Sequence, residues 1–120
     1  MDWFQREGEN AFALCPMTEA GFIRILTNPA FTGKKVEFTE ARAALARLSL
    51  IKGYRFWPMT RGLLEATAPF EGRFFSHRQV TDACLLGLAM ERKGSLATMD
   101  KAVRHLAGAE FAQHVIVIEG

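Results

Sequence analysis

Cysteine is scarce in this sequence, and the features of secreted and membrane chains are missing. Only Cys15 and Cys84 occur among the 120 residues, both within apolar stretches, which excludes a disulfide framework and is typical of buried thiols in a cytoplasmic protein. No apolar run approaches the ~18 residues of a membrane-spanning helix. The first ten residues also lack the basic and then apolar layout of a signal peptide. We therefore expect a cytoplasmic protein with no membrane partner.

Aspartate and net charge are also low. The chain has three Asp against ten Glu, and its formal net charge is only +2 while 49% of its residues are hydrophobic, which excludes a mainly disordered chain. A chain of this length buries roughly two-thirds of its unfolded surface, enough for a proper core. Composition therefore predicts one globular domain over residues 1–120, with no linker or internal repeat. Arg outnumbers Lys ten to five, which suits phosphate recognition but also occurs on ordinary solvated surfaces.

Short apolar runs alternate with helical patterns along the chain. Strands are predicted at residues 11–15, 54–57, 95–99 and 114–118, with helices between them. A first helix is expected from an N-cap at Thr18, followed by a loop over residues 30–38. The helix from about Gln79 to Lys93 is apolar on nearly every side, which predicts burial. This order favours an α/β layer fold with a mostly parallel sheet.

Three acidic residues share one local context, at a strand end or a helix start. Glu19 and Asp100 each follow a predicted strand and open a helix, and Asp82 lies in the first turn of the most apolar helix. In open parallel sheets ligands bind just beyond the carboxyl ends of the strands, so the three carboxylates could converge there. Clustered carboxylates need a counter-cation, and Mg²⁺ or Mn²⁺ suits oxygen ligands. The alternative is that each acid only stabilises a helix start.

Polar groups surround two of these acids in the sequence. His77, Arg78 and Thr81 precede Asp82, and Thr98 lies two residues before Asp100. Such groups could hydrogen-bond the carboxylates or contact a substrate phosphate, although a histidine in a loop is more often structural. The phosphate-binding loops GxxxxGK[ST] and GxGxxG are absent, which disfavours other phosphate-handling α/β enzymes.

Four blocks of the sequence resemble the PIN-domain ribonuclease toxins of the VapC family. They occur in the family's order and are spread over most of the chain: CPMTEAGFIRILTNP (15–29), RFWP (55–58), HRQVTDACLLGLA (77–89) and GSLATMDKAV (94–103). The TEAGF, VTDA and LATMD segments are specific in combination, whereas any one of them alone would be weak. The chain is therefore similar to the toxin halves of type II toxin–antitoxin pairs.

This resemblance implies a PIN-like fold, a Mg²⁺- or Mn²⁺-dependent endoribonuclease activity on RNA, a homodimer and a cognate antitoxin. Residue by residue, Glu19 matches the family's acid in T-E-x-G-F, Asp82 the acid of V-T-D-A, and Asp100 the acid after the L-A-T strand. Thr98 matches the family's hydroxyl position near the metal. These three acids would then be both metal ligands and catalytic residues.

One departure from the family's pattern concerns the start of the sequence. Only eighteen residues precede Glu19, MDWF resembles the tail of the family's first helix, and Asp2 follows no strand. We therefore expect an N-terminally truncated PIN-like fold without the family's first strand and first acid, and weak activity. The alternative function is a non-catalytic interaction module that binds an antitoxin or a second copy of itself.

Overall fold

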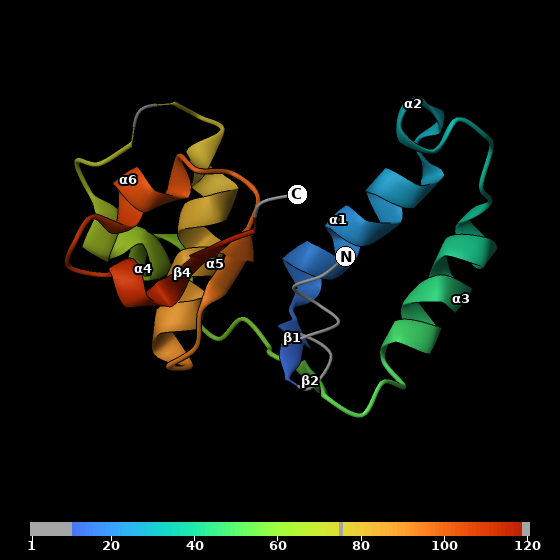
Figure 1. Cartoon of the computed structure of the whole chain (residues 1–120), viewed down its shortest axis with the longest axis horizontal. Coiled ribbons are helices and arrows are strands. Elements are labelled where there is room, and N and C mark those ends of the chain that lie inside the picture. The colour runs from blue at the N-terminus through green and yellow to red at the C-terminus, as the bar shows by residue number, and fades with distance from the viewer. Residues whose placement is uncertain (1–10, 75, 119–120) are drawn as a thin grey trace. The chain divides into compact units, whose positions relative to one another are not determined.

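Strands and helices alternate along the chain as the sequence predicts. The computed structural model describes residues 11–74 and 76–118, which divide into a first unit up to Met59 and a second unit from Thr60 onward. Each unit contains one pair of parallel strands together with helices (Figure 1). The predicted α/β class with parallel strands is thus confirmed, whereas a single domain over 1–120 stays a prediction. Asp2 and the MDWF segment lie outside the described residues.

The first unit contains a parallel strand pair connected through helices. Its elements are β1 (Phe12–Leu14), α1 (Pro16–Thr27), α2 (Pro29–Thr32), α3 (Phe38–Leu48) and β2 (Tyr54–Phe56). β1 pairs with β2 so that Phe12 lies opposite Tyr54, and their two rings meet edge to face with centroids 5.7 Å apart. α1 and α3 pack side by side (Figure 1). This packing buries little of α1, in which no described residue is fully buried.

Two sequence expectations in this unit are wrong. α1 begins at Pro16 after an N-cap at Cys15, not after Thr18, because proline fits the first position of a helix. The Thr18 hydroxyl instead accepts the Cys15 N–H and donates to the Cys15 carbonyl, both at 2.9 Å. Residues 30–32, expected as the start of a loop, belong to α2, since the Asn28 side chain accepts the N–H of Ala30 at 2.9 Å and starts a new helical turn.

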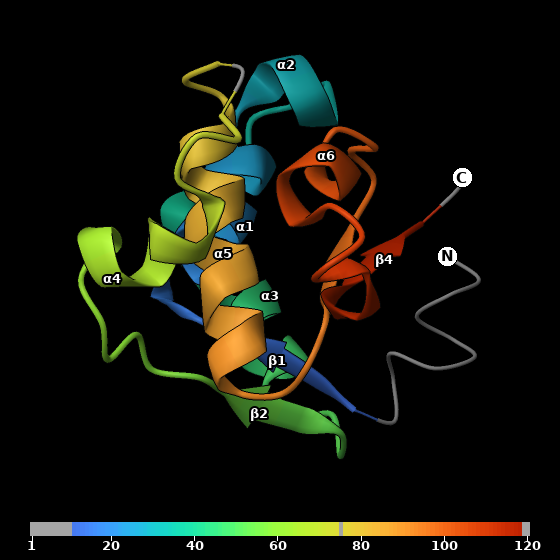
Figure 2. The same ribbon diagram turned by 90° about the vertical axis from the view of Figure 1, so that its left-hand side faces the viewer.

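The second unit is built around one buried helix. Its elements are α4 (Leu63–Thr67), the 3₁₀ turn η2 (Ala68–Phe70), α5 (Gln79–Glu91), β3 (Leu96–Thr98), α6 (Val103–Ala107), the 3₁₀ turn η3 (Ala112–His114) and β4 (Val115–Val117). β3 pairs with β4 in parallel, with Leu96 opposite Val115. α5 contacts both α4 and α6, which lie on either side of it in Figure 2.

The core of the second unit confirms the burial predicted for α5. It consists of Phe70, Ala83, Leu86, Val103, Leu106 and Ala107, with Met90, Leu96, Phe111 and Val115 packed against it. Cys84 lies in the same helix as a buried free thiol, and Cys15 is a buried free thiol of the first unit. Over the described ranges, no helix is both long and apolar enough to cross a membrane.

Candidate functional site

Asp82 lies in the first turn of α5, where the helix dipole favours a negative charge. Its side chain is half-buried, and the next residue, Ala83, is fully buried in the core. Burial raises the pKa of the Asp82 carboxyl above its ordinary value of 3.8, and the negative charge of Asp100 raises it further. The carboxyl groups of Asp82 and Asp100 therefore lie within electrostatic reach of each other.

A hydrogen-bonded turn holds Asp100 at the carboxyl end of β3. The Asp100 N–H donates to Oγ1 of Thr98 at 3.1 Å, and Asp100 Oδ1 accepts the N–H of Ala102 at 2.9 Å. The Asp100 carbonyl accepts the N–H of Val103, the first residue of α6, at 3.2 Å. Oδ2 of this exposed carboxylate has no hydrogen-bond partner among the described residues, which leaves it available to a ligand. Thr98 thus contacts the backbone of a predicted site residue.

Glu19 lies in the first unit, in the first turn of α1. Its N–H donates to the Cys15 carbonyl at 2.9 Å, so its backbone belongs to the start of the helix. Glu19 interacts electrostatically with Tyr54 of β2. Burial raises the pKa of the Tyr54 phenol above its ordinary value of 10.0, and the negative charge of Glu19 adds to this shift. The Glu19 carboxylate therefore lies near the strand that pairs with β1.

The structure brings together two of the three predicted acids. Asp82 and Asp100 interact within the second unit, whereas Glu19 belongs to the first, and its convergence with them stays a prediction. As far as it is described, neither unit gathers three His, Cys, Asp or Glu side chains into a group that could hold a metal ion. The Asp82–Asp100 pair would thus need further ligands from outside its own unit or from water.

The remaining predicted site residues flank the start of α5. His77, Arg78 and Thr81 are all exposed, in the turn before the helix and in its first turn. Ser76 and Gln79 organise this turn: the Ser76 hydroxyl accepts the Arg78 N–H at 3.2 Å, and Gln79 Oε1 accepts the Ser76 N–H at 3.3 Å. The sequence reasoning missed this pair, although the Ser-x-x-Gln spacing is a known signature of a helix start.

The chemistry of this pair of side chains fits a hard divalent cation. Both Asp82 and Asp100 offer carboxylate oxygens, the ligands that Mg²⁺ and Mn²⁺ prefer. Burial and, second to it, the charge of Asp100 disfavour the ionised Asp82 and raise its pKa, and a bound cation would favour the ionised form.

Comparison with known proteins places the chain in a family. It is 38% identical over 106 residues to ribonuclease VapC38 of Mycobacterium tuberculosis, which covers 88% of this chain and 73% of that protein. It is 35% identical over 111 residues to ribonuclease VapC39 of the same organism, covering 92% and 80%, and 31% identical over 101 residues to ribonuclease VapC44, covering 84% and 70%. No family model matches the sequence. On the similarity to these relatives, together with the parallel α/β fold, the chain belongs to the VapC family of PIN-domain toxins.

Proposed function

We propose that this protein is a Mg²⁺- or Mn²⁺-dependent endoribonuclease and the toxin of a toxin–antitoxin pair. The observation that carries the proposal is the interaction of Asp82 with Asp100, two carboxylates whose mutual repulsion a divalent cation would relieve. The relatives VapC38 and VapC39 are named ribonucleases, which supports RNA as the substrate class.

Asp82 and Asp100 would hold the ion, with Glu19 as the proposed third acid. A divalent ion bound there would supply an activated water molecule and would neutralise charge on a phosphodiester. The half-buried position of Asp82 strengthens its interaction with a cation, because charges interact more strongly where water is partly excluded. Asp100 contributes the carboxylate oxygen Oδ2, while its Oδ1 is engaged by the Ala102 N–H.

The chain's own polar residues would position the carboxylates and the substrate. Thr98 holds the backbone of Asp100 through its hydroxyl, and this fixes the direction in which the carboxylate leaves β3. Arg78 and His77 are exposed just before Asp82, where they would bind a phosphate of the RNA; the planar guanidinium of Arg78 suits bidentate contact. Thr81, also exposed, would donate a hydrogen bond to the phosphate backbone of the RNA.

The exposed apolar side chains of the first unit support binding to another protein. Five large apolar side chains are exposed among the residues described there, of which Ile25 (52%), Phe31 (70%) and Phe38 (58%) lie on helices, and Leu50 (83%) and Phe56 (45%) lie outside them. Exposed apolar side chains of this size on neighbouring helices are typical of surfaces that another protein covers. They support both a homodimer and an antitoxin as partners, and they equally favour the alternative of a non-catalytic interaction module. A cytoplasmic location suits the two buried free thiols.

Cleavage of a structured RNA by the purified chain tests this proposal. We expect cleavage with Mn²⁺ or Mg²⁺, its loss in EDTA, and its loss in Asp82→Asn, which preserves size but removes one ligand charge. Glu71→Gln is the matched control, because Glu71 is an exposed acid of the same unit outside the candidate site. Cleavage that persists in EDTA would overturn the metal-dependent reaction. Binding of Mn²⁺ without any cleavage would favour the non-catalytic alternative.

A further inference from the structure

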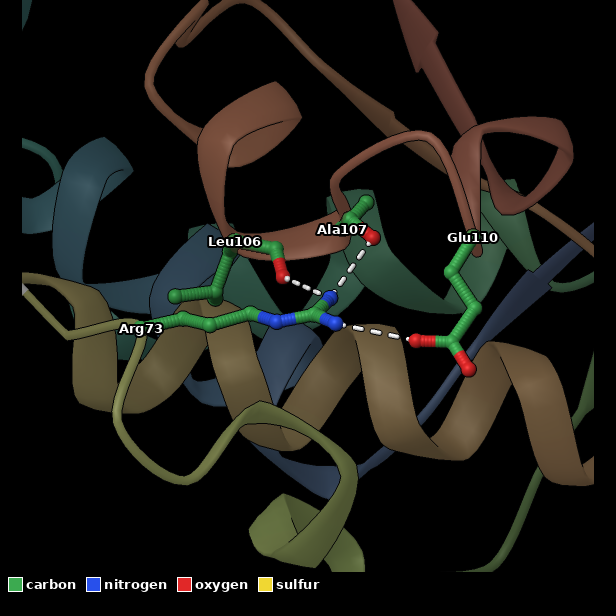
Figure 3. Close-up of polar contacts among 4 residues, drawn as sticks. All are labelled: Arg73, Leu106, Ala107 and Glu110. Carbon is green, nitrogen blue, oxygen red and sulfur yellow. Dashed lines mark hydrogen bonds and ion pairs between the residues drawn. The ribbon is translucent and has the colours of Figure 1, made fainter.

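Arg73 binds the end of α6 through several contacts at once (Figure 3). Its Nη1 donates to the carbonyl oxygens of Leu106 at 3.2 Å and Ala107 at 2.9 Å, and its Nη2 pairs with Glu110 Oε1 at 2.9 Å. The guanidinium also lies 5.5 Å from the ring centroid of Phe111. One side chain from the loop after η2 thus holds the segment in which α6 ends and the chain reverses.

These contacts add hydrogen-bond donors at the end of α6, where the Ala107 carbonyl also accepts the Phe111 N–H at 3.2 Å. The last carbonyls of a helix have no N–H within the helix to bind, and a cation at this end also interacts favourably with the helix dipole. α6 ends at Gly108, whose φ of 62° and ψ of −170° belong to a region that side chains other than glycine rarely adopt. A Cβ atom at this position would also come within 3.3 Å of Nη1 of Arg73. A glycine at position 108 therefore allows both the chain reversal and the close approach of the Arg73 guanidinium.

The other end of α6 carries Asp100. The Asp100 carbonyl accepts the N–H of Val103, and its Oδ1 accepts the N–H of Ala102, so the turn with the carboxylate is continuous with the helix. α6 has only five residues, and Val103 and Leu106 pack into the core beside α5. This packing anchors the apolar face of the helix, but apolar contacts supply no hydrogen bond to the carbonyls at the helix end. Backbone hydrogen bonds from Gly108 to Arg104 at 2.8 Å and from Phe111 to Ala107 at 3.2 Å close this end, and Arg73 adds side-chain hydrogen bonds from a separate loop.

We infer that Arg73 is a positioning residue for Asp100: by holding the end of α6 it fixes the turn that presents the Asp100 carboxylate beside Asp82, and it thereby sets how tightly this pair binds a divalent cation. The inference rests on the metal site proposed above. Among the described residues, Arg73 hydrogen-bonds neither the Asp82 nor the Asp100 carboxylate, and it acts only through α6, whose other end carries the Asp100 turn.

Titration of Mn²⁺ into the full chain by calorimetry tests this role in three variants. Arg73→Met keeps the aliphatic stem and removes the donors, and we expect the dissociation constant for Mn²⁺ to rise about tenfold, the lower end of the effect seen for residues that orient metal ligands. Arg73→Lys retains the charge but not the fork, and it should give about a threefold rise. Arg61→Met is the matched control. Arg61 pairs with Glu65 at 3.1 Å and Glu91 at 3.7 Å in the same unit, away from α6, and its loss should change Mn²⁺ affinity less than about twofold.

Amide hydrogen exchange of the metal-free protein provides a second readout, resolved by residue with NMR. In Arg73→Met we expect faster exchange at the Asp100 and Ala102 amides, with no change at Leu86 in the core of α5. Acceleration at Leu86 to the same extent would indicate a general loss of stability and would overturn the positioning role. In Arg61→Met the three amides should exchange as in the wild type.

The outcomes separate this inference from the function on which it rests. If the wild type binds no Mn²⁺, the proposed metal site fails, and the exchange data still decide whether Arg73 orders the Asp100 turn. If the wild type binds Mn²⁺ and a folded Arg73→Met binds it equally well, the positioning role is overturned while the metal site stands. If Arg73→Met does not fold, Arg73→Lys decides by the same two measurements.

Discussion

Gly87 of α5 lies directly against the backbone carbonyl of Ala66 in α4. A Cβ atom at Gly87 would overlap the Ala66 oxygen and would come within 2.9 Å of the Ala66 carbonyl carbon. Both residues are buried, so an added methyl group at Gly87 would have to fit between the two helices. This approach fixes how closely α4 and α5 pack, and α5 is the helix whose first turn carries Asp82.

We expect Gly87→Ala to destabilise the fold by about 1–3 kcal/mol, because an inserted methyl group must push the two helices apart. The matched control is Gly21→Ala in the interior of α1, where the new Cβ would meet only Arg24 Nη2 at 3.9 Å. There the substitution should stabilise by roughly 0.5–1 kcal/mol through helix propensity. Urea denaturation of the two variants measures both effects. A Gly87→Ala protein as stable as the wild type would contradict the observed helix contact.

The raised pKa of Asp82 predicts a specific pH dependence of metal binding. The folded state favours the protonated form of a carboxyl whose pKa it raises. The metal-free protein should therefore become less stable as the pH rises through the raised pKa of Asp82. Mn²⁺ and a proton also compete for the same carboxylate. Calorimetry should therefore show Mn²⁺ affinity falling as the pH is lowered, beginning at a higher pH than an ordinary aspartate with a pKa of 3.8 would give.

Asp100→Asn provides the internal check on this pH dependence. Removal of the Asp100 charge leaves burial as the cause of the shift, so the pKa of Asp82 should fall toward its ordinary value without reaching it. NMR titration of the Asp82 carboxyl carbon measures this change directly. An unchanged pKa would mean that the two carboxylates do not interact.

Sequence patterns predicted the second unit better than the first. Asp82 in the first turn of a buried helix and Asp100 after a strand could be located because their surroundings are local: an apolar helix, a short strand and a turn. The start of α1 was misplaced because Thr18 and Cys15 form a reciprocal pair in which the threonine occupies the third helical position. The Arg73 contacts were beyond prediction, since they join residues more than 30 positions apart.

His77 and Asp82 should differ in how strongly their substitution affects cleavage. Asp82→Asn removes a ligand charge, and we expect RNA cleavage to fall about 100-fold or more, together with Mn²⁺ affinity. His77→Ala removes only a group at the exposed turn before α5, and it should lower cleavage less than about tenfold without changing Mn²⁺ affinity. Steady-state cleavage at saturating Mn²⁺ distinguishes them. A loss in His77→Ala as large as that expected for a general acid or base, about 100-fold or more, would contradict the supporting role.

Self-association should depend on the apolar surface of the first unit. We expect the chain to be a homodimer at micromolar concentration, and Phe31→Ser to shift it toward monomer, because Phe31 is 70% exposed on α2. Leu64→Ser in α4 is the control, since Leu64 is 85% exposed but lies in the other unit. Light scattering with both variants gives the answer. A wild type that is monomeric at these concentrations would rule the homodimer out.

The only tyrosine of the chain, Tyr54, offers a direct probe of Glu19, the proposed ligand that belongs to the first unit. The negative charge of Glu19 disfavours the phenolate of Tyr54, so Glu19→Gln should lower the Tyr54 pKa while burial keeps it above 10.0. Ultraviolet absorbance of the phenolate during alkaline titration measures this shift, and Glu71→Gln should leave it unchanged.

The same ring reports whether Glu19 holds the metal at neutral pH. Mn²⁺ is paramagnetic, so an ion bound by the Glu19 carboxylate should broaden the NMR signals of the Tyr54 ring at substoichiometric concentration, because the two side chains lie within electrostatic reach. Glu19→Gln should remove a ligand and weaken the broadening, whereas Glu71→Gln should not. If Mn²⁺ binds to the chain, perturbs Asp82 and leaves the Tyr54 signals sharp, then Glu19 is not a ligand, and the third acid must be sought elsewhere.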